Sequence, residues 1–224
     1  MMIAGGAEEL CATEAAVFDT LYATSTQNDS PSVTPSPFDQ TRDGLVIGEG
    51  ADSLILEELE SAQARGAKIY AEIVGFATNT DGAHITQPQA ATMQAAMQKA
   101  LDDAGLTAKD IGYISAHGTA TELGDIAESI ATYNIFGDKT PISAFKSFTG
   151  HTLGACGALE AWVAINMMNE NWAHATANLS NIDPQCADLD YIQEKSRVLD
   201  TEYVMSNNFA FGGINTSLIF KRWN

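Results

Sequence analysis

Two histidines, each inside a short polar motif rich in glycine, have the surroundings that carbonyl chemistry needs. His117 opens the segment HGTAT (117–121), His151 closes the segment KSFTGH (146–151), and NNFAFGG (207–213) follows near the C-terminus. Neutral imidazoles donate hydrogen bonds to a carbonyl oxygen that becomes an enolate oxyanion, and one such donor in a dry site is worth ~3 kcal/mol. The motifs therefore predict a site that holds and polarises a carbonyl, although no obvious nucleophile accompanies them.

Two charged residues could support the imidazoles. Lys146 lies five residues before His151 and would help to keep that ring uncharged and oriented. Glu128 follows one helical turn after Asp125 and could pair with the lysine. A plain buried ion pair is an equally good interpretation of Lys146 and Glu128, and either histidine alone could be a turn or capping residue. The combination of two histidines with a lysine favours catalysis.

The third motif depends on its glycines. Gly212 and Gly213 allow the positive φ angles that alanine adopts only at a cost. Backbone N–H groups in such a turn can form an oxyanion hole, and Phe211 can close an apolar channel. A hairpin turn flanked by two core phenylalanines is the alternative.

Strands and helices alternate along the chain. Apolar patterning with glycine and proline punctuation predicts strands at 2–4, 45–56 (interrupted by a turn), 69–77, 111–116, 142–145, 203–208 and 216–221, and helices at 8–18, 59–64, 91–104, 126–136 and 154–168. Gly5-Gly6 reads as a turn, so residues 2–4 are expected to be the last residues of a longer strand. This suggests that the chain has lost its beginning. The alternation predicts an α/β sandwich, with the motifs near the C-terminal ends of strands, where such folds bind ligands.

Composition excludes several classes of function. The formal charge of -18, from 29 acidic and 11 basic residues, argues against nucleic acid as a partner. The three cysteines show no metal-binding spacing, so no metal site is expected. No apolar run approaches the ~20 residues of a membrane span, and no secretory signal is recognisable. We expect no membrane association and a cytoplasmic location.

Together the motifs resemble the β-ketoacyl-acyl-carrier-protein synthases, the condensing enzymes of fatty acid synthesis. The similarity runs from residue 1 to residue 222 and includes, in family order, AGGAEELC, RDGLVIGEG, RGAKIYAE, HGTAT, KSFTGH, NNFAFGG and LIFKR. The resemblance implies a thiolase-like layered αβαβα sandwich, here incomplete because the N-terminal portion with the nucleophile is missing. Residues 1–66 would be a remnant of the N-terminal half, and residues 67–224 the C-terminal half.

The family pattern also assigns roles to individual residues. His117 and His151 resemble the histidines that hold the malonyl carbonyl and stabilise the enolate, with Lys146 as supporting lysine and Glu128 as its partner. Phe211 resembles the gating phenylalanine beside the oxyanion hole. Thr119 and Thr121 resemble contacts to the phosphopantetheine arm of the substrate, which the acyl carrier protein brings, so no cofactor of the chain's own is expected.

The sequence departs from the family pattern mainly at the nucleophile. In the family a cysteine is acylated, and it precedes the segment that matches residues 2–6, so we expect this chain to begin after it. Cys11 and Cys156 read as small buried apolar residues, and Cys186 lies in a loop. There are three smaller departures. Ala120 stands where the family usually has glycine or serine, Glu122 where it usually has proline, and Ala210 where it usually has glycine.

The sequence thus predicts the C-terminal part of an elongating synthase that catalyses decarboxylative Claisen condensation of malonyl-carrier protein with an acyl thioester. Acyl carrier protein would be the partner, the full-length protein would be a homodimer, and the isolated chain would condense negligibly. One alternative is a non-catalytic subunit that completes a heterodimer with a cysteine-bearing partner. Another is a thiolase acting on coenzyme A esters, against which the second histidine counts.

Overall fold

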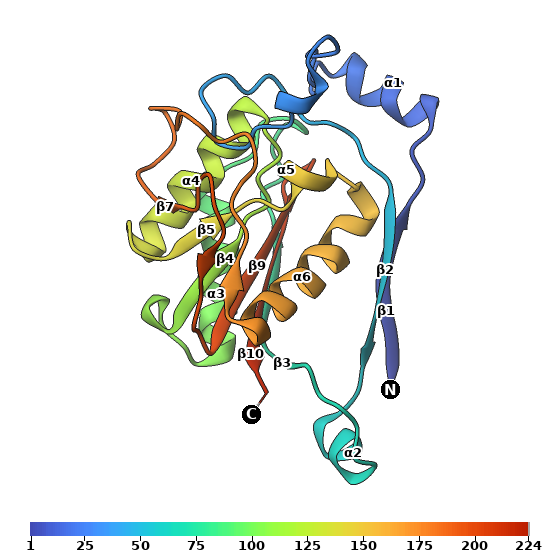
Figure 1. Cartoon of the computed structure of the whole chain (residues 1–224), viewed down its shortest axis with the longest axis vertical. Helices are drawn as coiled ribbons and strands as arrows, with labels where there is room; N and C mark the ends of the chain where they lie inside the picture. The colour runs from blue at the N-terminus through green and yellow to red at the C-terminus, as the bar shows by residue number, and fades with distance from the viewer. Residues whose placement is uncertain (224) are drawn as a thin grey trace.

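The computed structural model describes residues 1–223 and is built around a six-stranded mixed sheet (Figure 1). The strand order is β3-β10-β9-β4-β5-β7. The bounds are β3 Ala71–Thr80, β4 Ile111–Ser115, β5 Pro141–Ser143, β7 Asp190–Tyr191, β9 Tyr203–Ala210 and β10 Ile214–Arg222. Strands β3, β10 and β9 pair antiparallel, whereas β9, β4, β5 and β7 pair parallel. The parallel half brings the ends of β4 and β5, which precede the two histidine motifs, to one edge.

Helices cover both faces of this sheet, and a ribbon lies outside one of them. Helices α3 (Ala90–Ala104) and α4 (Glu122–Phe136) share one core with the sheet, and α6 (Cys156–Glu170) packs on the opposite face. The antiparallel ribbon of β1 (Met2–Glu8) and β2 (Gly50–Leu56) packs on the far side of α6 (Figure 1). Residues 1–223 therefore form four successive layers, α, β, α and β, as a layered sandwich requires.

Strand alternation separates two apolar cores. Ile114 of β4 and Met205 of β9 point into the core under α3 and α4, whereas their neighbours Tyr113 and Val204 point toward α6. Successive strand side chains face opposite sides of a sheet, so both faces of β4 and β9 are covered. A strand buried on both faces reads as a continuous apolar run, and the prediction for 111–116 is confirmed.

The N-terminal region differs from the sequence prediction. Gly5 and Gly6 lie within β1 rather than in a turn, and a Cβ on Gly6 would overlap the carbonyl oxygen of Gly154. These glycines therefore serve close packing of the ribbon on the turn before α6. The first helix, α1, spans Ala12–Thr20 instead of starting at residue 8, and the expected strand at 45–56 is reduced to β2. Cys11 caps α1 and is exposed, not buried.

The remaining elements are short. They are α2 (Leu59–Ala64), α5 (Lys146–Thr149), the two-stranded pair β6 (Trp172–Ala173) and β8 (Arg197–Val198), and the 3-10 turns Pro31–Val33, Ala108–Asp110 and Leu153–Ala155. Within residues 1–223, no helix is both long and apolar enough to cross a membrane.

Candidate active site

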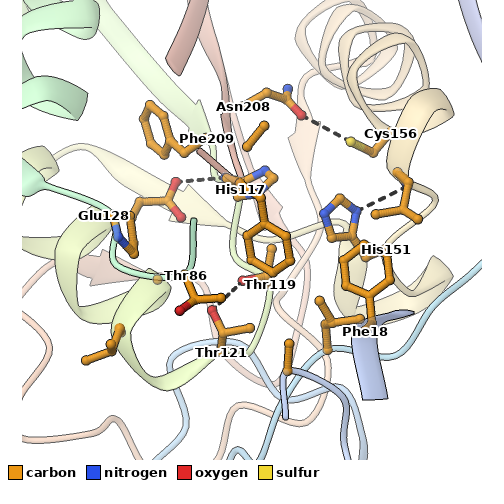
Figure 2. A pocket seen from close by; sticks show the side chains of 18 of the residues that line it. Phe18, Thr86, His117, Thr119, Thr121, Glu128, His151, Cys156, Asn208 and Phe209 are labelled. Carbon is orange, nitrogen blue, oxygen red and sulfur yellow. Dashed lines mark hydrogen bonds between the residues drawn. The ribbon is translucent and has the colours of Figure 1, made fainter. Parts of the chain in front are cut away.

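The histidine motifs meet at a cavity of about 790 Å³ (Figure 2). His117 and His151 both line it, and their ring centroids are 5.3 Å apart with the rings nearly perpendicular. Lys146 lies behind them, and its side chain is almost fully buried. The predicted convergence of these three side chains is confirmed.

Glu128 fixes the loop that carries His117. Its two carboxylate oxygens accept the backbone N–H groups of His117 and Gly118, each at 2.7 Å. Gly118 has a φ of +42°, and a Cβ there would come within 2.5 Å of the Cβ of Ala144, so the tight turn requires glycine. Burial raises the pKa of Glu128 to about 8, against the two N–H donors, which act to lower it.

Lys146 forms its ion pair with Glu160, not with Glu128 as the sequence suggested. The lysine Nζ lies 2.5 Å from Glu160 Oε1 and 2.8 Å from the carbonyl oxygen of His117, and both side chains of the pair are nearly inaccessible. Burial opposes the charge on Lys146, but the nearby carboxylates outweigh it and raise the pKa of the lysine. Glu128 and Glu160 therefore divide two tasks, since one holds the backbone and the other holds the ammonium.

Both imidazoles are held as neutral rings with the proton on Nε2. Lys146 Nζ lies 3.2 Å from Nδ1 of His117, and the N–H of Leu153 donates to Nδ1 of His151 at 3.2 Å. A neutral ring that accepts at Nδ1 carries its hydrogen on Nε2. Burial, followed by the positive charge of Lys146, lowers the pKa of His151 to about 3 and that of His117 well below its ordinary value. Each ring thus keeps one N–H donor, at Nε2, and both residues line the cavity.

Cys156 also lines the cavity, which the sequence did not indicate. Its thiol donates to Oδ1 of Asn208 at 3.2 Å (Figure 2). Burial raises the pKa of this thiol to about 11, so at neutral pH only about one molecule in 10⁴ carries the reactive thiolate. Within residues 1–223, no group of three or more His, Cys, Asp or Glu side chains could hold a metal ion.

Thr119 and Thr121 lie side by side in the cavity lining. The hydroxyls of Thr119 and Thr121 are 2.9 Å apart, and both residues line the cavity. Phe211 lines it as well and packs against Phe18 of α1, with ring centroids 5.5 Å apart. The substrate contacts that the resemblance implies for these three residues stay predictions.

Gly212 and Gly213 do not act as the sequence suggested. Their φ angles are +81° and +71°, so the conformational prediction is confirmed. The N–H of Gly212 donates to the carbonyl of Ile85, and that of Gly213 donates to the carbonyl of Ala210. Neither glycine is part of the cavity lining, so the turn in this conformation offers no oxyanion hole from these two N–H groups.

Sequence reasoning missed Glu160, Asn208 and Phe209. Phe209 is buried, and its ring centroid lies 6.2 Å from that of His117. Glu160 is the one acidic residue in the apolar stretch 153–168, and an isolated acid on a buried helix face predicts a buried partner. Nothing in the sequence distinguishes Asn208 from Asn207, because only the strand's orientation decides which of them faces the cavity.

Comparison with known proteins shows the family of the chain. The family profile of the β-ketoacyl synthase N-terminal domain matches residues 1–62, and that of the C-terminal domain matches residues 70–180. The division predicted between residues 66 and 67 stays a prediction. The 3-oxoacyl-[acyl-carrier-protein] synthase 2 of Coxiella burnetii is 43% identical over 228 residues, covering 99% of this chain and 55% of that protein.

Solved structures share the fold over the whole chain. A crystal structure of a β-ketoacyl synthase from Burkholderia phymatum has 65% sequence identity and a TM-score of 0.98, covering 100% of this chain and 55% of that one. A type II polyketide ketosynthase, determined in complex with its acyl-carrier protein, has 35% identity and a TM-score of 0.94, covering 100% of this chain and 56% of that one. The chain therefore spans little more than half the length of the proteins it matches.

Proposed function

The chain belongs to the β-ketoacyl synthase family and has its thiolase-like fold, and from this premise we propose that it carries the malonyl-decarboxylating part of a 3-oxoacyl-acyl-carrier-protein synthase of fatty acid elongation. Support comes from the name of the Coxiella relative. The observation that carries the proposal is the pair of neutral imidazoles, 5.3 Å apart, each with its Nδ1 engaged by a fixed donor.

The two rings act on the thioester carbonyl of a malonyl group. When the bond between the methylene carbon and the carboxylate breaks, CO2 leaves and the electron pair becomes an enolate with its charge on the thioester oxygen. Nε2–H groups of His117 and His151 donate to that oxygen, and each such donor contributes ~3 kcal/mol to transition-state stabilisation. Neither ring is a charged imidazolium at neutral pH. The rings therefore stabilise the enolate oxygen by hydrogen bonding and do not protonate it.

Lys146 maintains this state of the rings. Its ammonium lies 3.2 Å from Nδ1 of His117 and keeps that nitrogen an acceptor. Glu160 in turn holds the ammonium in place. The ion pair therefore fixes the donor direction of His117 and takes no proton from the substrate.

The wall with Thr119 and Thr121 would bind the amides of the phosphopantetheine arm, and Phe211 would close the apolar end. Acyl carrier protein is the proposed donor of the thioester, in keeping with the carrier-protein complex of the related ketosynthase. A homodimer is the proposed state of the full-length enzyme. Condensation needs a thiolate to hold the acyl group, and the protonated thiol of Cys156 does not supply one.

The test is the release of CO2 from malonyl-acyl-carrier protein by the purified chain, followed as conversion to acetyl-carrier protein by mass spectrometry. We expect decarboxylation without formation of 3-oxoacyl product when an acyl thioester is added. His117→Ala and His151→Ala should each slow decarboxylation at least about a hundredfold. His84→Gln, an exposed histidine outside the cavity lining, is the matched control.

Two results would contradict the proposal. One is decarboxylation that survives both histidine substitutions. The other is condensation by the unaided chain at a rate comparable with decarboxylation. A malonyl-coenzyme A substrate that reacts as well as malonyl-carrier protein would instead favour the thiolase-like alternative.

A further inference from the structure

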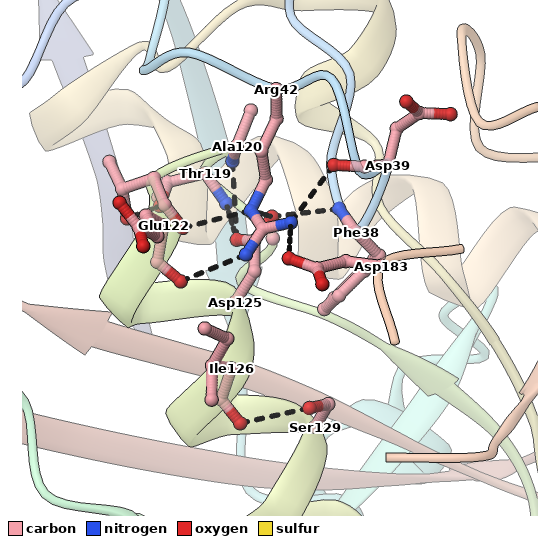
Figure 3. Close-up of polar contacts among 12 residues, drawn as sticks. Phe38, Asp39, Arg42, Thr119, Ala120, Glu122, Asp125, Ile126, Ser129 and Asp183 are labelled. Atoms are coloured by element: carbon pink, nitrogen blue, oxygen red, sulfur yellow. Dashed lines mark hydrogen bonds and ion pairs between the residues drawn. The ribbon is translucent and has the colours of Figure 1, made fainter. Parts of the chain in front are cut away.

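Arg42 forms part of the cavity wall but takes no part in the chemistry proposed above. Its side chain is 2% exposed and lies between two carboxylates (Figure 3). Nε is 3.5 Å from Oδ2 of Asp125, and Nη1 is 2.6 Å from Oδ2 of Asp183. A buried guanidinium with two acidic partners on different segments joins those segments.

The guanidinium also binds the backbone of the substrate-facing loop. Its Nε donates to the carbonyl oxygen of Thr121 at 3.4 Å and its Nη2 to that of Glu122 at 3.0 Å, while Nη1 donates to the carbonyl oxygen of Asp39. All three nitrogens are thus engaged within the protein. Arg42 therefore acts on the loop and is not a free cation for a phosphate.

Asp125 holds the other side of the same loop. This fully buried carboxylate accepts the N–H groups of Thr119 and Ala120 at Oδ1 (3.1 and 3.2 Å) and that of Phe38 at Oδ2 (2.7 Å). Ala120 has a φ of +63°, a left-handed conformation that persists in alanine only when surrounding contacts fix it. Together, Asp125 and Arg42 hold the backbone on both sides of this strained residue.

The two hydroxyls on the cavity wall depend on this backbone. Thr119 and Thr121 flank Ala120, and their Oγ1 atoms are 2.9 Å apart. We propose that Arg42 and Asp125 are positioning residues for the pantetheine arm of the substrate, because they set the spacing and direction of this hydroxyl pair. The inference rests on the proposed function, in which these hydroxyls bind the amides of that arm.

The imidazoles are positioned by other residues. Glu128 holds the backbone at His117 and Gly118, and the hydrogen-bond partners of the two rings are Lys146 and Leu153, not Arg42. Loss of Arg42 should therefore weaken binding of the arm while leaving the decarboxylation step largely intact. A residue needed only for folding would not discriminate between substrates with long and short arms.

The experiment compares malonyl-pantetheine with the malonyl thioester of ethanethiol, which keeps the thioester and lacks both amides of the arm. For Arg42→Met and Asp125→Asn we expect the KM for malonyl-pantetheine to rise about tenfold or more, with kcat within about threefold of wild type and little change in KM for the short substrate. Arg42→Lys, which keeps the charge without the planar fork, should recover only part of the loss. Arg65→Met, which removes an exposed ion pair outside the cavity lining, is the matched control.

A binding measurement separates this inference from the proposed function. Calorimetric titration with pantetheine itself should show affinity at least about tenfold weaker for either variant than for wild type, whether or not the chain decarboxylates. Near-UV circular dichroism selects variants that keep the native fold, and the isosteric Asp125→Asn provides the test if Arg42→Met does not fold. Absence of pantetheine binding by the wild-type chain, or equal weakening toward the long and short substrates, would overturn the inference.

Discussion

Replacement of Lys146 by methionine would leave Glu160 as a buried carboxyl without its cation. Glu160 is 1% exposed, and its Oε1 is 2.5 Å from the lysine Nζ. Burial raises the pKa of this carboxyl, and the lysine is the principal group that lowers it. In Lys146→Met the folded protein should therefore keep Glu160 protonated at pH values where the unfolded chain ionises it.

The magnitude follows from the ordinary glutamate pKa of about 4.5. Each pH unit above this value costs the variant about 1.36 kcal/mol, because the folded state must retain a proton that the unfolded state releases. The electrostatic loss reaches about 3.4 kcal/mol at pH 7 and about 1.4 kcal/mol at pH 5.5. The stability of the variant thus falls by about 2 kcal/mol between pH 5.5 and pH 7. The pKa of Glu160 is already raised in wild type, but Lys146 holds it lower than in the variant, so the difference from wild type widens by at most this amount.

Urea unfolding followed by far-UV circular dichroism at the two pH values measures this difference. Lys146→Met combined with Glu160→Gln is the control, since an amide cannot ionise and the pH dependence of the loss should vanish. A destabilisation by Lys146→Met that is the same at both pH values would refute the reasoning. It would show that the lysine stabilises the fold through packing and not through its charge.

One further substitution and one labelling reaction test local features. Gly213→Ala should lower the free energy of unfolding by about 1–2 kcal/mol or more, because the residue has a φ of +71° and its Cβ would meet the carboxylate of Asp81. Thermal unfolding measures this loss, and an unchanged melting temperature would exclude the strain. Of the three thiols, the exposed Cys11 should react with iodoacetamide at pH 8 at least about 10² times faster than the buried Cys156 and Cys186, whose pKa values burial raises to about 11. Peptide mass spectrometry gives the rates, and rapid labelling of Cys156 would contradict its assignment as an inert thiol.

The sequence predicted the convergence of His117, His151 and Lys146 better than it predicted the residues that hold them. His117 follows β4 and Lys146 follows β5, and since the ends of adjacent parallel strands share an edge, their proximity followed from the order of elements. The partner of Lys146 could not be found in this way. Spacing along a helix identifies local neighbours only. Glu160 lies on α6, which packs on the face of the sheet opposite to α4, the helix that carries Glu128.

The glycines illustrate the same limit. Gly212 was correctly expected to have a positive φ, because a turn between two strands demands it. Gly5 and Gly6 suggested a turn by the same rule, yet they lie in β1, where Gly6 is needed for contact with Gly154. Whether a glycine serves conformation or close approach depends on a partner segment that the local sequence does not contain.

The position of α6 between two β layers has a consequence for how dissolved salt acts on this protein. The central sheet packs on one side of α6 and the β1–β2 ribbon packs on the other. Glu160 of α6 and its partner Lys146 are covered by these layers, and both side chains are almost inaccessible to water. Mobile ions screen exposed charges over about 8–10 Å at physiological ionic strength and screen buried pairs far less. The chain as a whole has a formal net charge of -18, and its exposed charges are open to such screening. In the proposed function, added electrolyte should therefore change how a charged carrier approaches the protein and leave the bond-breaking step almost untouched.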